Sequence, residues 1–312
     1  SLALLAAFVP AGLAHAQTSV ETFVMNVAGV VNSTIPGCTT GAAPPPVAAI
    51  FGANGNFQPN AGIAPCGLGG GTRSQTAFTG PLSDAAALPL WAWSTNSYTG
   101  DAAATAVHGV LEAESHSTLV GFGNYSGSEG MSVFRDRLTI TSPSTANGTN
   151  GTIRFWSTIS GALSVASGPG TSDVELWYRV NGVGSIQMRA QATSPLALPF
   201  VAACCDTVDG FALVNGSMSG SDELGSQAIP FVFGTPFDFR LALLAYTTPG
   251  NTATAHADFT AQLTRIEVRD AASQLVAGFQ DAAEAGAHYG PNGVVPAVPA
   301  LGHAVAGLLA SA

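Results

Sequence analysis

The chain has 312 residues, only 9% of which are charged, and its formal net charge at pH 7 is −10. All nine of its cationic side chains are Arg, and it has no Lys. Nucleic-acid binding needs cations that replace the counterions of phosphate, so this composition argues against a nucleic-acid partner. A chain of this length can bury a substantial hydrophobic core.

The N-terminal residues have the pattern of an export signal. Residues 2–14 form an apolar run that closes on Ala14-His15-Ala16, and an apolar stretch of about 7–15 residues before such a tripeptide is typical of a signal peptide. The run is shorter than the ~20 residues of a transmembrane helix. We therefore expect residues 1–16 to be a signal peptide and the protein to be secreted, the alternative being a buried first helix.

Residues 17–77 are expected to form a loop-rich lead-in that packs on the main domain. The strand-like segment 20–31 is followed by stretches rich in Gly and Pro. Cys38 and Cys66 lie in these stretches and are each other's most plausible disulfide partners, since an exported protein favours disulfides. Cys204 and Cys205 would then remain as a vicinal pair or as free thiols, although four cysteines allow three pairings.

Residues 78–293 show the alternation of β-strands. In Asp173–Val180 the even positions (Val174, Leu176, Tyr178 and Val180) would share one face, and Trp177 would share the other with charged residues. Similar segments cover 104–117, 134–142, 151–165, 185–192, 236–248 and 253–270, with turn residues between them. The prediction is an all-β, antiparallel β-sandwich of jelly-roll-like form, with helical turns at most near 84–90 and 279–287.

Three segments carry a resemblance to a known group. FRDRLTITSP with GTIRFWSTISGALS, HADFTAQLTRIEVRDAASQLVAGFQDAAEAGAHYG, and the proline-led tail VVPAVPALGHAVAGLLASA (294–312) resemble segments of the exosortase-sorted PEP-CTERM proteins of Gram-negative bacteria. The resemblance covers roughly residues 78–312. It implies a protein of the outer cell surface or extracellular matrix, associated with exopolysaccharide and without an assigned activity. It also implies a sorting tail at 294–312, so that membrane contact would be transient and limited to the hydrophobic ends.

A stripe of His and Glu is the first candidate site. If 104–119 is one strand, the alternate residues from His108 to His116 project from a single face, each about 7 Å from the next: His108, Val110, Glu112, Glu114 and His116. Such side chains can ligate a metal, and two carboxylates can act as an acid/base pair in glycoside hydrolysis. The alternative is a solvated strand face.

Acidic loops are the second candidate site. Asp206 and Asp209 follow the cysteine pair, and Asp222-Glu223 lie further on in a Gly/Ser-rich segment. Calcium prefers several oxygen ligands of this kind, but Asp and Ser are also ordinary turn residues. We expect no cofactor, and calcium is the alternative.

Aromatic side chains are the third candidate site. Trp91, Trp93 and Trp177 could stack on sugar rings if they are exposed, whereas buried Trp serves in core packing. No G-x-S-x-G nucleophile elbow is present. We therefore expect a non-catalytic surface or matrix protein that can self-associate. The alternatives are a carbohydrate-binding module and a glycoside-active enzyme using Glu112 and Glu114.

Overall fold

The computed structural model describes residues 18–27, 70–77, 80–93, 96–121, 127–181, 183–290 and 293–295. The expected signal peptide, the Cys38–Cys66 pair and the tail beyond residue 295 lie outside these residues. Every regular element within them is a β-strand. The described part of the chain contains no helix that is long and apolar enough to cross a membrane.

The strands form two antiparallel sheets. Sheet 1 has the order β10 (Phe200–Ala203), β9 (Val183–Ala192), β8 (Gly170–Val180), β14 (Phe237–Pro249), β6 (Gly127–Thr141), β1 (Ser19–Val27) and β2 (Gly70–Ala77), with β16 (Gln280–Ala283) also paired to β6. Sheet 2 has the order β11 (Phe211–Val214), β12 (Ser217–Gly225), β7 (Asn150–Ala166), β15 (Ala253–Asp270), β5 (Val110–Val120), β4 (Asn96–Val107) and β3 (Leu82–Trp93), with β13 (Ile229–Val232) also paired to β7. A short pair, β17 (His288–Gly290) and β18 (Gly293–Val295), completes the fold.

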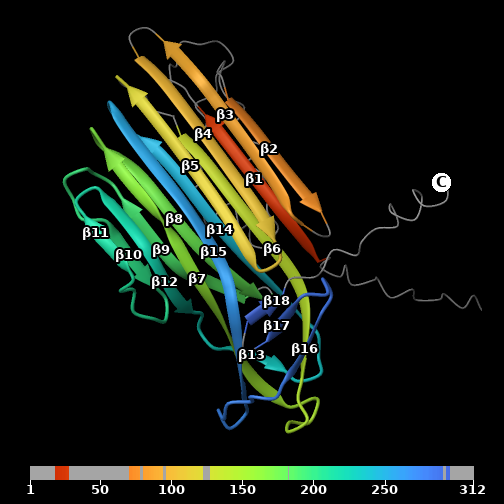
Figure 1. Cartoon of the computed structure of the whole chain (residues 1–312). Helices are drawn as coiled ribbons and strands as arrows, with labels where there is room; N and C mark the ends of the chain where they lie inside the picture. Colours follow the sequence, from red (N-terminus) through yellow and green to blue (C-terminus); the bar gives the residue numbers. More distant parts are fainter. Residues whose placement is uncertain are drawn as a thin grey trace, which may run out of the picture.

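The two sheets pack face to face as a β-sandwich, which confirms the predicted fold class. Figure 1 shows their long strands running together along the length of the molecule, with β13, β16, β17 and β18 at its lower end. The core contains stacked Phe155 and Phe239, whose ring centroids are 5.0 Å apart, and Phe134 lies edge-on to Phe239. Val174, Leu176, Tyr178 and Val180 of β8 are all buried there, as their alternation predicts.

The interior is polar at the opposite end from β16 and β17. Tyr98 Oη and Ser128 Oγ lie 2.9 Å apart, and Ser117 donates a hydrogen bond of 2.8 Å to Thr247 Oγ1. Ser115 donates to the Ser128 carbonyl at 2.7 Å. These hydroxyls satisfy one another between the sheets, so the polar groups are buried with partners.

Both ends of the expected lead-in belong to the sandwich. β1 pairs with β6 on one side and with β2 on the other, so residues 19–27 lie inside sheet 1. The expected helical turns are wrong: residues 84–90 lie in β3, and β16 occupies 280–283. Pairing with β4 along most of its length holds the Ala-rich segment of β3 extended.

Candidate functional site

The outer face of sheet 1 carries most of the chemistry. Outward side chains on β8, β14 and β6 stand opposite one another in rows. Three groups on this face are used below. The acidic end contains Asp173, Tyr246 and Glu129, with Glu175 beside them, and the arginine row contains Arg179, Arg240 and Arg135. Between them lies the apolar belt, which spans two rows; Trp177 packs against it, and its members are almost completely buried: Phe23, Met131, Val133, Ala242 and Leu244.

Trp177 is held beside a network of charged side chains. It is partly exposed, and its indole Nε1 donates a hydrogen bond of 2.8 Å to Glu175 Oε2. Arg189 on β9 contacts Glu175 Oε1 at 3.2 Å through its Nε and Asp173 Oδ2 at 2.8 Å through its Nη2. Gln191 donates to the same Asp173 oxygen at 2.7 Å. The indole is therefore oriented next to carboxylates, a guanidinium and an amide.

The carboxylates of the acidic end are buried although they lie on an outer face. Burial raises the pKa of Asp173 above its ordinary value, and hydrogen bonds from Arg189 and Gln191 offset part of this. Burial also raises the pKa of Glu175, with the neighbouring Asp173 adding to the effect. Burial alone raises the pKa of Glu129 to about 7. Asp173 Oδ1 and Glu129 Oε1 have no hydrogen-bond partner among the described residues.

The residues of the His and Glu stripe, except His108, lie on the outer face of sheet 2. Glu112, Glu114 and His116 project from β5, and His116 Nδ1 lies 2.9 Å from Asp101 Oδ2. His256 on β15 stands opposite His116, with ring centroids 4.2 Å apart. Burial and Asp258 raise the pKa of Glu114, while burial and His116 lower the pKa of His256.

His108 does not belong to this stripe, because residues 104–119 are not a single strand. A two-residue turn, His108-Gly109, reverses the chain between β4 and β5, with Gly109 at φ 89°. Glycine adopts this left-handed conformation without strain. The His108 ring is buried, with Nε2 3.2 Å from the Arg135 carbonyl oxygen. The Gly after His108 is the sequence signal for this hairpin.

The candidate metal ligands are not gathered into a preformed centre. Within the described ranges, no three His, Cys, Asp or Glu side chains are arranged to hold a metal ion. In the acidic loops, Asp222 accepts hydrogen bonds from the Asp209 and Gly210 amides, and Asp206 accepts one from Gly225. Glu223 contacts Arg265 at 3.2 Å. These carboxylates stabilise the local turns and strand ends.

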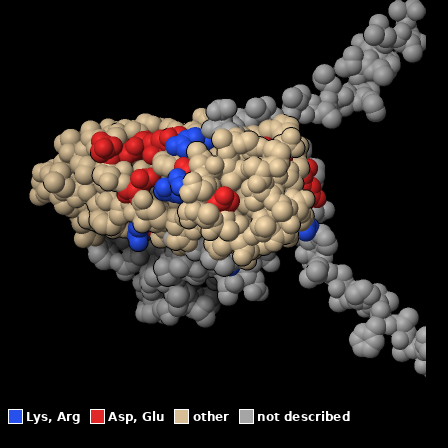
Figure 2. Space-filling view, turned by 90° about the horizontal axis from the view of Figure 1, so that it is seen from below, with Lys and Arg blue, Asp and Glu red and all other residues tan. Residues whose placement is uncertain are grey.

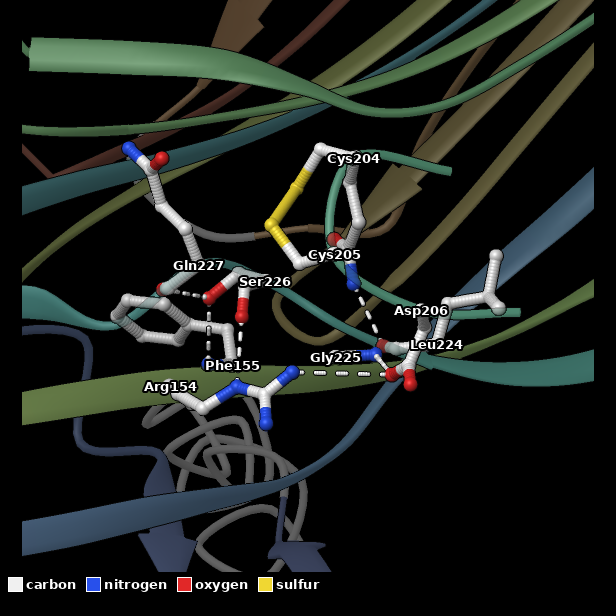
Figure 3. The surroundings of a disulfide bond; sticks show 10 residues. Arg154, Phe155, Cys204, Cys205, Asp206, Leu224, Gly225, Ser226 and Gln227 are labelled. Atoms are coloured by element: carbon white, nitrogen blue, oxygen red, sulfur yellow. Dashed lines mark hydrogen bonds and ion pairs between the residues drawn. A yellow bond between two sulfur atoms is a disulfide. The ribbon is translucent and has the colours of Figure 1, made fainter. Parts of the chain in front are cut away.

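Cys204 and Cys205 form a vicinal disulfide, with an S–S distance of 2.25 Å. Figure 3 shows it at the turn after β10, above Asp206, which lies near Arg154 and Gly225. Both cysteines are exposed. Hydrogen bonds flank the disulfide on both sides. The Cys204 amide donates to the Gln187 carbonyl oxygen at 3.0 Å, and the Asp206 carboxylate accepts a hydrogen bond from the Gly225 amide.

The remaining tryptophans have different surroundings. Trp91 and Trp93 lie in β3, but their side chains are outside the part that the structure describes. Trp156, on the outer face of sheet 2, lies under the guanidinium groups of Arg265 and Arg154, at 4.0 and 4.8 Å from its ring centroid. Trp177 is therefore the predicted sugar-contacting residue whose surroundings are defined.

Sequence reasoning missed the partners that come from other strands. It placed Asp173, Glu175, Trp177 and Arg179 on one face of β8, which is correct. It did not find Arg189, Arg240 or His256, because their positions beside the site depend on strand register. The alternation in 236–248 and 253–270 shows only which side of its own strand each residue occupies.

No family model matches the chain, and neither a curated protein nor a solved structure shows detectable similarity to it.

Proposed function

We propose that this chain is a non-catalytic, exported β-sandwich protein of the cell surface or extracellular matrix that binds polysaccharide through the outer face of sheet 1. The observation that carries the proposal is the Trp177 site. A partly exposed indole lies beside Glu175, which accepts its Nε1 hydrogen, and beside Arg189. The run before Ala14-His15-Ala16 supports export.

The site offers the groups that a sugar requires. An aromatic ring provides a flat apolar surface for the C–H face of a pyranose, and its position can be fixed by a hydrogen bond from its polar edge. Carboxylate, amide and guanidinium groups supply acceptors and donors for hydroxyl groups. Sites of this kind combine an apolar surface with a few fixed polar groups. A sheet face also presents these groups along a line, which suits an extended chain.

The proposal is tested by binding of the full chain to a panel of immobilised polysaccharides, with Trp177→Ala and Trp177→Phe as variants. We expect Trp177→Ala to weaken binding at least about tenfold and Trp177→Phe to retain most of it, since aromatic stacking contributes on the order of 1 kcal/mol or more. Trp156→Ala is the control, because Trp156 lies on the other sheet. Circular dichroism of each variant verifies folding.

Three results would overturn the proposal. One is the absence of binding to every polysaccharide in the panel. Another is equal loss of binding in Trp177→Ala and Trp156→Ala, which would place the contact elsewhere. The third is release of reducing sugar by the wild type, abolished by Glu112→Gln, which would show that the protein is an enzyme.

A further inference from the structure

Three arginines stand side by side across the middle of sheet 1. Arg240 on β14 is the direct cross-strand neighbour of Arg179 on β8 and of Arg135 on β6. Directly opposed residues in an antiparallel pair have Cβ atoms roughly 5 Å apart, and like charges in this position are destabilising. The nine arginines of this chain are its only strong cations, so one third of its positive charge is placed in this row.

At one end of the row, the charge of Arg135 is balanced by a carboxylate. Glu21 on β1 pairs with Arg135 through two contacts, at 2.8 and 3.1 Å. The guanidinium of Arg240 makes no hydrogen bond or ion pair with any described residue. Burial, followed by the charge of Arg135, lowers the pKa of Arg240 to about 10. The centre of the row is thus a partly buried cation whose five N–H donors have no partner among the described residues.

The arginine row lies apart from the acidic end of the same face, although Glu21 and Asp238 are acids on its own side of the belt. The apolar belt lies between the arginine row and the acidic end. Arg240 and Tyr246 are six residues apart on β14, which corresponds to about 20 Å along the strand. Trp177 and Arg179 are alternate residues on one face of β8, roughly 7 Å apart. Figure 2 shows one face of the molecule, on which most described atoms are uncharged and the charged ones lie in several small patches of both signs.

We infer that the arginine row binds the anionic groups of an acidic polysaccharide whose sugar ring contacts Trp177. This inference rests on the proposed function and names its substrate class. The planar guanidinium groups bind carboxylate or sulfate oxygens with paired hydrogen bonds. An anion there would give Arg240 a partner and would relieve the repulsion from Arg135 and Arg179. Because the whole chain carries a net charge of −10, a polyanion is attracted only by such a local site.

The experiment compares matched polymers and matched variants of the full chain. Polygalacturonate and its methyl ester differ in carboxylate charge, while dextran sulfate and dextran differ in sulfate charge, so the two pairs distinguish the source of the anion. The variant is Arg240→Gln, and the control is Arg269→Gln, whose arginine lies on β15 of sheet 2 and pairs with Glu267. Binding isotherms are measured at two salt concentrations.

We expect wild type to prefer a charged polymer over its neutral counterpart, and Arg240→Gln to lose at least about tenfold in affinity for it. Arg269→Gln is expected to bind as wild type does. The slope of log affinity against log salt should become shallower in Arg240→Gln, because one fewer anionic contact is made. The thermal midpoint of wild type, but not of Arg240→Gln, should rise with oligogalacturonate or sulfated oligosaccharide.

Binding to neutral polymers alone, dependent on Trp177 and unchanged in Arg240→Gln, would overturn this inference and leave the proposed function intact. Absence of binding to all four polymers would overturn this inference, and absence of binding to the whole panel of polysaccharides would overturn the proposed function as well. Equal weakening in Arg240→Gln and Arg269→Gln would also overturn the inference, because it would indicate a general charge effect. Arg240→Gln should melt no lower than wild type without ligand, which verifies that any loss of binding is not a loss of folding.

Discussion

Tyr289 donates its hydroxyl hydrogen to Asp136 Oδ2 at 2.7 Å, joining β17 to the interior face of β6. Both residues are almost completely buried. The other carboxylate oxygen accepts hydrogen bonds from the Ala285 and Arg137 amides, at 3.0 and 2.8 Å. Burial and the neighbouring Asp136 raise the pKa of Tyr289 well above its ordinary value, so the hydroxyl remains a donor. This hydrogen bond connects β17, near the C-terminal end of the described residues, to the core.

Tyr289→Phe is expected to destabilise the protein. The substitution leaves a buried carboxylate oxygen without its donor, and an unsatisfied buried acceptor costs about 1–3 kcal/mol. Urea denaturation measures the change in the free energy of unfolding. Tyr246→Phe is the control, since Tyr246 lies on the outer face of sheet 1, and its effect should stay within about 0.5 kcal/mol. Equal stability of Tyr289→Phe and wild type would show that the hydrogen bond contributes nothing.

The fold was predictable where the sequence alternates strictly. β15 buries every second residue along most of its length, and β8 places its even residues from Val174 to Val180 in the core, so the period of two in each sequence marks the face that meets the core. Residues 84–90 have no such alternation, and their Ala-rich composition favours a helical turn over a strand. The pairing of β3 with β4 decides their conformation, and pairing between segments is a tertiary effect that local composition does not encode.

The candidate site was predictable only within single strands. The shared face of Trp177, Glu175 and Arg179 follows from the period of two. The opposition of Arg240 to Arg179 depends on the register between β14 and β8, which are separated by more than fifty residues. The His108 error has a local cause, because the Gly109 turn shifts the chain into a second strand.

Gly130→Ala is expected to destabilise the protein by about 1–3 kcal/mol, because small-to-large changes at tightly packed positions force the backbone to move. A methyl group on Gly130 would collide with the carbonyl oxygens of Ala103 and Glu114, where β6 approaches sheet 2. Gly278→Ala is the control, since no atom lies within 4 Å of its added methyl group. Thermal unfolding compares the two variants. A Gly130→Ala midpoint equal to that of Gly278→Ala would contradict the close approach of the sheets.

The double substitution of Cys204 and Cys205 by Ser is expected to have a small effect on stability. A disulfide stabilises mainly by restricting the unfolded chain, and joining adjacent residues restricts it by only about 1 kcal/mol. Since both cysteines are exposed, mild reduction followed by alkylation should label them in the folded protein. Chemical denaturation of the double variant measures the free energy. A loss above about 3 kcal/mol would mean that the turn after β10 helps to hold the sandwich together.

Glu129→Gln is expected to remove a pH-dependent cost. The folded-state pKa of Glu129 is about 7 against an ordinary value of 4.5, so the unfolded chain loses its proton at a lower pH than the folded protein. Stability from this group therefore falls as pH rises from about 4.5 to 7, and the cost is complete above pH 7. At about 1.4 kcal/mol per pKa unit it amounts to about 3 kcal/mol.

The test of this cost is denaturation of wild type and Glu129→Gln at pH values on both sides of the Glu129 pKa. The variant should be more stable than wild type above pH 7, and the two should converge below about pH 4.5. Glu112→Gln, at an exposed position on sheet 2, is the matched control and should follow wild type throughout. A constant difference between Glu129→Gln and wild type at every pH would mean that the Glu129 carboxyl group is not titrating in this range. Its effect would then come from packing beside Tyr246 and not from the burial of charge.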